Sequence, residues 1–321
     1  MEAFFKISNY LRDTVALSEA IIPIFSLIAL GWVARRFSLI SDRSTSILNS
    51  FAFYFALPAL FFTSIYMMNF KVFLNTGLLF AVIIPILLSA SLAFIYASVF
   101  RKDGKTKAAY VLGSFLGNNA YLAIPFISLS FGTAYEPITA LIGAVYFSVG
   151  MVLNLFVLEY YSSKKKPRLG RVLLHVIRVP TIWGIVAGVA FSFIVTYYGV
   201  RMPLFAANTL SLIAAPASAI ALFALGTFMY RKSKIDLKEV LTLCTFKNIL
   251  LPVATFLLIG FFMPAGIDSK IVILQATMPM AVTNFVLAER YNVRRELISN
   301  AIVVSTIFSV LTLSAMTFIL S

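Results

Sequence analysis

Residues 113–125 read Gly-Ser-Phe-Leu-Gly-Asn-Asn-Ala-Tyr-Leu-Ala-Ile-Pro and lie inside an apolar run that extends from about residue 108 to residue 131. Two adjacent asparagines in the middle of a membrane segment are costly unless they are hydrogen-bonded or face a cavity. Gly117 lowers the barrier to unwinding, and Pro125 removes one backbone donor and frees a carbonyl one turn earlier. The stretch therefore predicts a membrane helix that breaks into two half-helices.

A second polar cluster around a proline lies in the matching part of the second half. Residues 275–284 read Gln-Ala-Thr-Met-Pro-Met-Ala-Val-Thr-Asn. Prolines at membrane depth also recur in order about half a chain apart: Pro23, Pro58, Pro85 and Pro125 match Pro180, Pro216, Pro252 and Pro279. Broken helices in two matching halves indicate the substrate site of a secondary transporter.

Composition predicts an all-α integral membrane protein. Hydrophobic residues make up 61% of the 321 residues, charged residues make up 12%, and the mean hydropathy is +0.96. A membrane-spanning helix needs about 20 mainly apolar residues. Ten runs of this kind are expected at residues 17–34, 46–66, 74–100, 108–131, 138–160, 180–198, 203–230, 246–263, 271–288 and 297–320.

The net charge of +14 is distributed in a way that argues against a nucleic-acid partner. Lys and Arg concentrate in or beside the loops that follow spans 1, 3, 5, 7 and 9. Since basic loops mark the cytoplasmic side, both termini are expected outside a bacterial cytoplasmic (inner) membrane. Five spans in each half then require two inverted five-helix repeats, and the expected fold has broken helices 4 and 9 crossing at the membrane centre.

The expected division of the chain is a first repeat at residues 1–160, a basic cytoplasmic linker at 161–179 and a second repeat at 180–321. Within the linker, Arg171, His175 and Arg178 fall on one face of a helix. This pattern suits an amphipathic segment on the inner leaflet, and it equally suits a basic anchor at the start of span 6.

Several kinds of chemistry lack the residues they would need. The carboxylates all fall in loops or near span ends, so a buried carboxylate pair for cation exchange is not expected. With one His and one Cys, no metal site is predicted, and no cofactor is implied. No GxSxG, HExxH or GxxxxGK[ST] motif is present, so neither a hydrolase nor an ATP-driven pump is predicted.

The two broken helices predict a binding site for an anion. If the breaks cross, each second half-helix points its N-terminus, with free N–H groups and a positive dipole end, at the crossing. Asn118, Asn119, Gln275 and Thr277 can add side-chain donors. The alternative is that these amides only brace helix packing. Lys247 is expected to be an interfacial anchor that reaches water, with a possible anion-attracting role at the cytoplasmic entrance.

The chain resembles the auxin efflux carrier family, which includes bacterial permeases for malate and malonate, from about Ile21 to Leu320. The family's pattern in span 4, Asn-x-Gly-Phe-x-Gly-x-Pro, is similar to residues 118–125, although Ala120 and Ala123 replace the two glycines. Further matches lie at residues 22–31, 56–62, 214–216, 224–226, 247–252, 278–279, 284 and 305–306.

The resemblance implies a scaffold of helices 1, 2, 6 and 7, a homodimer contact through that scaffold, and a mobile transport core of helices 3–5 and 8–10. It implies elevator-type transport of a small organic anion, by uniport or with protons. The predicted substrate-binding residues are Asn118, Asn119, Tyr121, Pro125, Gln275, Thr277, Pro279, Thr283 and Asn284. The alternatives are a sodium-coupled carrier of the bile-acid type and a non-transporting anion sensor.

Overall fold

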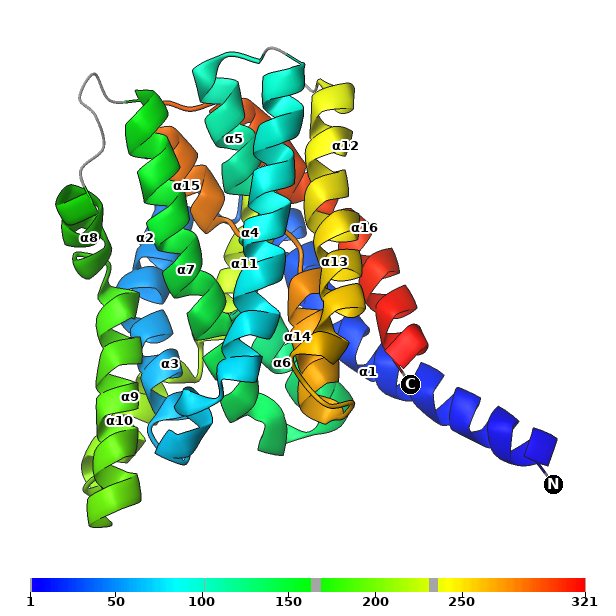
Figure 1. Cartoon of the computed structure of the whole chain (residues 1–321), viewed down its shortest axis with the longest axis vertical. Helices are drawn as coiled ribbons and strands as arrows, with labels where there is room; N and C mark the ends of the chain where they lie inside the picture. Colours follow the sequence, from blue (N-terminus) through cyan, green and yellow to red (C-terminus); the bar gives the residue numbers. More distant parts are fainter. Residues whose placement is uncertain (1, 101, 163–168, 231–235, 321) are drawn as a thin grey trace.

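The computed structural model describes residues 2–100, 102–162, 169–230 and 236–320, and this part of the chain is helical with no β-strand (Figure 1). Eight helical stretches in it are long and apolar enough to cross a membrane. They are Ser18–Arg36, Asp42–Ile65, Thr76–Val99, Thr133–Tyr161, Pro180–Tyr198, Leu204–Met229, Leu237–Phe261 and Arg295–Leu320. The chain is therefore a multi-pass membrane protein, and these stretches match expected spans 1–3, 5–8 and 10.

Expected spans 4 and 9 are each divided into two shorter helices. The α-helices are α1 (Glu2–Arg36), α2 (Asp42–Phe51), α3 (Leu57–Ile65), α4 (Thr76–Val99), α5 (Gly104–Phe115), α6 (Ala123–Phe131), α7 (Glu136–Ser162), α8 (Leu169–Ile177), α9 (Pro180–Tyr198), α10 (Leu204–Ala214), α11 (Ala217–Met229), α12 (Leu237–Thr245), α13 (Leu251–Leu258), α14 (Ile267–Thr277), α15 (Thr283–Arg290) and α16 (Arg295–Leu320). Short 3-10 turns, η2 (Phe70–Leu74), η3 (Thr133–Tyr135) and η5 (Ile259–Phe261), join some of them.

Two membrane prolines follow directly after one-turn π-helical stretches. These stretches are η1 (Ala52–Ala56), before Pro58, and η4 (Phe246–Leu250), before Pro252. In each, the residue before the proline donates its N–H to the carbonyl five residues back, from Leu57 to Ala52 and from Leu251 to Phe246. A proline ring clashes with the carbonyl four residues earlier, and the wider π turn relieves that clash within a continuous helix.

Glycines allow two pairs of helices to pack backbone against backbone. A Cβ atom at Gly226 in α11 would overlap the Ile28 carbonyl of α1, and one at Gly31 in α1 would overlap the Phe223 carbonyl of α11. In the same way, Gly184 of α9 lies against the Pro58 carbonyl of α3. These pairs join expected spans 1 and 7, and expected spans 2 and 6.

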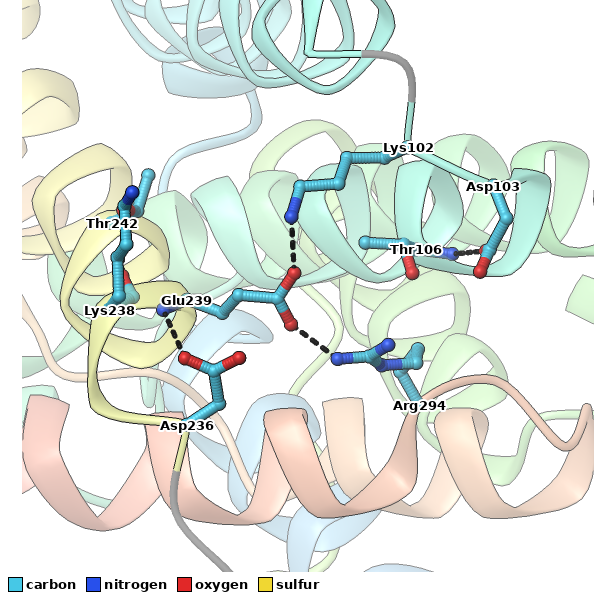
Figure 2. A network of polar contacts seen from close by, with 8 residues as sticks. All are labelled: Lys102, Asp103, Thr106, Asp236, Lys238, Glu239, Thr242 and Arg294. Atoms are coloured by element: carbon cyan, nitrogen blue, oxygen red, sulfur yellow. Dashed lines mark hydrogen bonds and ion pairs between the residues drawn. The ribbon is translucent and has the colours of Figure 1, made fainter.

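Figure 2 shows an ionic network at one end of the bundle, where α12, the α4–α5 connection and the α15–α16 turn meet. The Glu239 carboxylate, with an 11% exposed side chain, pairs with Lys102 Nζ at 2.5 Å and with Arg294. Asp236 caps α12 by accepting the Glu239 N–H. Asp103 caps α5, and the Thr106 N–H bonded to its carboxylate holds the pKa of Asp103 below its ordinary value.

The basic linker is described only in part, because Lys164, Lys165, Lys166, Pro167 and Arg168 lie outside the described residues. After them, α8 is a separate helix that ends before α9 begins at Pro180. Its Val172 and Val176 are buried, while Leu173, Leu174 and Ile177 are exposed. His175 Nδ1 lies 2.8 Å from Oε1 of Glu159, a buried residue of α7. The placement of α8 on the inner leaflet stays a prediction.

Candidate functional site

The breaks in expected spans 4 and 9 lie against each other. Residues 116–122 separate α5 from α6, and residues 278–282 separate α14 from α15. The Asn118 N–H donates to the Pro279 carbonyl at 2.7 Å, and the Ala281 N–H donates to the Leu116 carbonyl at 3.1 Å. Gly117 and Met280 form an antiparallel bridge between them. Each interrupted helix therefore satisfies part of the backbone of the other, which lipid cannot do.

Asn119 fastens the first break to α14 and thereby to α7. Its Nδ2 donates to the carbonyl of Gln275 at 2.8 Å and to Oε1 of Gln275 at 2.7 Å, and its Oδ1 accepts the Gly117 N–H at 3.0 Å. Gln275 Nε2 donates in turn to the Thr139 carbonyl at 2.8 Å. Asn119 and Gln275 are both buried, and these bonds engage the amide groups of both side chains. The two residues brace the fold at this point.

Asn118 is placed differently from its neighbour. Its side chain makes no hydrogen bond within the described residues, although only 8% of the residue is exposed. The polar atoms of its side chain lack partners but are not completely shielded from solvent. Among the described residues, the Asn118 side-chain amide therefore has no partner, whereas that of Asn119 is fully engaged.

Tyr121 points from the same break toward expected span 2. Its hydroxyl donates to the Ala52 carbonyl at 3.0 Å, at the start of the π-helical stretch η1. Pro125 falls in the first turn of α6 and is only partly buried. Both residues thus border the first break, and Tyr121 joins it to α2 and α3.

The remaining predicted residues line the second break. Pro279 lies in the break itself, and Thr283 is the first, partly buried residue of α15. Asn284 is fully buried; its Nδ2 donates to the Leu116 carbonyl at 3.1 Å, while its Oδ1 has no partner within the described residues. The Thr277 hydroxyl donates to the Ile273 carbonyl within its own helix. Asn284 therefore ties the breaks together, and Thr277 bonds within α14.

The position of Lys247 corrects the sequence interpretation. An interfacial anchor would hold its amine in water, but the Lys247 side chain is fully buried. Its Nζ donates to the Ala276 carbonyl, at 2.8 Å, in the last turn of α14. The interpretation was wrong because Lys247 belongs to the π-helical stretch η4, and that stretch packs against α14.

Three residues that support the two breaks, Ser305 and Asn248 at the second and Gly143 at the first, were not predicted to belong to the site. The Ser305 hydroxyl accepts the Met280 N–H at 2.9 Å and donates to Oδ1 of Asn248 at 2.7 Å. Asn248 Nδ2 donates back to the Ser305 carbonyl at 3.2 Å. In the first half, Gly143 of α7 lies against the Asn119 carbonyl with no space for a Cβ atom. Asn248 and Ser305 could have been assigned to the site because they are polar residues in apolar spans. The sequence contains no comparable indication for Gly143.

The chemistry that this arrangement offers is that of non-covalent binding. The described residues contain no group of three or more His, Cys, Asp or Glu side chains that could hold a metal ion. The N-termini of α6 and α15 begin directly after the breaks. Their first N–H groups, those of Ala123, Ile124, Asn284 and Phe285, donate to carbonyls of the breaks, so these ends offer the positive end of the helix dipole rather than free donors. Such ends favour anionic groups, and Asn118 adds a side-chain amide beside them.

Comparison with known proteins identifies transporters among the relatives of this chain. Residues 16–317 match the family described as "Membrane transport protein". The chain is 26% identical over 320 residues to the "Putative malonate transporter" of Rhizobium meliloti, covering 95% of this chain and 96% of that one. It is 23% identical to an "Uncharacterized transporter" of Methanothermobacter thermautotrophicus, over 92% of this chain and 96% of that one.

A plant relative links the match to auxin carriers. The "Probable auxin efflux carrier component 9" of Oryza sativa subsp. japonica is 28% identical over 139 residues, which cover 41% of this chain and 32% of that one. The resemblance drawn from the sequence motifs is thereby confirmed. The chain belongs to the membrane transport protein family that includes the auxin efflux carriers, and it is a membrane transporter rather than an enzyme.

Proposed function

We propose that this transporter is a secondary carrier that moves a small organic anion through a site at the two helix breaks. The observation that carries the proposal is the direct pairing of residues 116–118 with residues 279–281, next to the N-termini of α6 and α15. Asn118 supports it further, because its side-chain amide has no partner within the described residues. The Asn118 amide offers a hydrogen-bond donor to a carboxylate, and the positive dipole ends of α6 and α15 favour its negative charge without a full positive charge.

We further propose a topology of ten spans. In it, α5 with α6 forms the fourth span and α14 with α15 forms the ninth, so that two inverted five-helix repeats cross at the membrane centre. The matching proline positions and the two glycine-packed pairs, α1 with α11 and α3 with α9, support the symmetry. In an inverted repeat, span 1 corresponds to span 6 and span 2 corresponds to span 7. The contact between spans 1 and 7 (α1 with α11) then corresponds to the contact between spans 6 and 2 (α9 with α3).

In this proposal α4–α7 and α12–α16 form a transport core that moves past a scaffold of α1–α3 and α9–α11. The Tyr121–Ala52 hydrogen bond joins core to scaffold and would have to break during such a movement. The protein would lie in the inner membrane of a bacterium with both termini outside, and would dimerise through its scaffold. The clustering of Lys and Arg in alternate loops supports the orientation.

Small dicarboxylates are the first substrates to test, since the relative from Rhizobium meliloti has malonate in its name. Auxin-like aromatic monocarboxylates come second, given the plant relative. We propose uniport or proton-linked movement. A monoanion leaving a negative-inside cell gains about 2.3 kcal/mol per 100 mV, so export requires no coupling ion.

The proposal is tested by uptake of labelled malonate, malate and indole-acetate into proteoliposomes. Sodium, the pH gradient and the membrane potential are varied one at a time, and protein-free liposomes provide the baseline. We expect sodium-independent flux of at least one anion that responds to the potential or the pH gradient. Flux that occurs only with sodium would instead indicate a bile-acid-type carrier. Binding without flux would indicate a sensor, and either result would overturn the proposal.

A further inference from the structure

The Lys247 amine is fully buried and has no carboxylate partner within the described residues. Its side chain has no exposed surface, and none of the ion pairs between described residues includes it. Burying an ammonium group costs several kcal/mol unless polar groups compensate it. A residue needed only for packing would avoid that cost by being apolar, so the charge itself calls for an explanation.

The Lys247 amine lies at the carbonyl end of α14 and beside the first break, just past the end of α5. It donates to the Ala276 carbonyl at 2.8 Å, in the last turn of α14. It also lies beside Gly117, just past the end of α5, since a Cβ atom there would be 3.2 Å from Nζ. The C-terminal end of a helix carries partial negative charge and unpaired carbonyls. A cation is therefore stabilised where α5 and α14 end.

In other transporters with broken helices, the carbonyl ends of half-helices and unwound backbone coordinate the Na⁺ or H⁺ that is carried along with the substrate. We propose that the Lys247 ammonium is a built-in cation that occupies this position, so that a soluble sodium ion is not required. It lies next to Gly117, the residue that precedes Asn118, and its charge offsets that of an anion bound in the break. Lys247 is thus a positioning and specificity-determining residue for the proposed anion.

This inference rests on the proposed function and adds two consequences to it. Transport by the wild-type protein is independent of sodium because its cation is covalently attached. The charge of Lys247, rather than its hydrogen bond to Ala276, is what anion transport requires. If Lys247 only stabilised the fold through its hydrogen bond to Ala276, any hydrogen-bond donor at that position would suffice. Substitutions can therefore separate the role of the charge from the role of the hydrogen bond.

Three variants separate charge from hydrogen bonding. Lys247→Arg keeps a positive charge, Lys247→Gln keeps a neutral donor, and Lys247→Met keeps the apolar stem alone. Each is reconstituted in proteoliposomes and compared with the wild type in malonate counterflow, in sodium chloride and in choline chloride of equal ionic strength. Size-exclusion chromatography and thermal unfolding establish that each variant is folded. If Lys247→Met does not fold, Lys247→Gln, which keeps a donor, carries the test.

We expect equal wild-type counterflow in sodium and choline. Lys247→Gln and Lys247→Met should each lose about tenfold or more, as for loss of a charged group's interaction, while Lys247→Arg retains part of the flux. Counterflow of Lys247→Gln equal to that of the wild type would overturn the inference, and so would a sodium requirement in the wild type. If the wild type moves none of the anions in either salt, the proposed function itself fails; wild-type flux combined with unchanged Lys247→Gln flux contradicts only the role of Lys247.

Discussion

Asn118 and Asn119 are neighbours in sequence, yet their side chains differ in their hydrogen bonds. Asn119 makes three hydrogen bonds, to Gly117 and to two atoms of Gln275, whereas the Asn118 side chain makes none within the described residues. A buried polar group that loses its partners is destabilised, because the remaining group stays desolvated. A side chain without partners can be removed at little cost to the fold. Stability and transport should therefore respond differently at the two positions.

For Asn118→Ala we predict a loss of transport of about tenfold or more with a nearly unchanged unfolding temperature, because the lost amide bonds a ligand rather than the protein. The matched variant, Asn119→Ala, should lower stability by about 1–3 kcal/mol, because it leaves the Gln275 side chain without its donor. Anion flux and thermal unfolding in detergent are measured on both. Normal flux in Asn118→Ala, or an unchanged melting temperature in Asn119→Ala, would show that the roles are assigned wrongly.

The residue types at the site could be predicted from sequence, but their pairings could not. The polar clusters around Pro125 and Pro279 follow from the cost of amides in an apolar span. Which asparagine is free depends on where Gln275 lies relative to it in space, and no local pattern contains that information. Lys247 illustrates the same limit, since a lysine near a span end usually reaches water, whereas this one packs inward against α14.

At the scale of elements, the broken helices follow from the sequence because glycine, asparagine and proline act locally. The division of spans 4 and 9 into α5–α6 and α14–α15 lies where those residues occur. The π-helical stretches before Pro58 and Pro252 were not predicted, since they accommodate a proline without ending the helix. The glycine contacts between α1 and α11 were not predicted either, because they depend on which helices become neighbours.

Gly226→Ala tests the close packing of α11 on α1. A methyl group there would overlap the Ile28 carbonyl, and backbone cannot move aside as a flexible side chain can. We expect a loss of stability of about 1–3 kcal/mol, as for overpacked cores, seen as a lower melting temperature. The control is Gly260→Ala, because nothing lies within 4 Å of a Cβ atom at that position. Equal melting temperatures for the two variants would contradict the packing described for this pair.

At the scale of the whole molecule, the Glu239 network joins three separate segments. Lys102 comes from the α4–α5 connection, Arg294 from the α15–α16 turn and Glu239 from α12, as Figure 2 shows. All three segments belong to the proposed transport core, and none belongs to the proposed scaffold. The network therefore links the two halves of the core and favours its movement as one body.

Glu239→Gln should weaken the core without altering the substrate site. The carboxylate is mostly buried, so its replacement leaves two cations without their shared partner; we expect about 1–3 kcal/mol of destabilisation. Thermal unfolding measures this loss, and the KM for the anion should stay within about twofold because the site is not touched. Lys238→Gln on the same helix serves as the control, since Lys238 is exposed and forms no ion pair within the described residues. The same melting temperature in both variants would exclude a stabilising role for the network.

The most direct test of the central claim is an electron cryomicroscopy structure of the protein with malonate bound. The account predicts ligand density between the two helix breaks, in contact with the Asn118 amide and the N-termini of α6 and α15. Density elsewhere, with the breaks empty, would contradict it. One such place is the cavity of about 470 Å³ whose lining includes Asp236, Arg294 and Asn300.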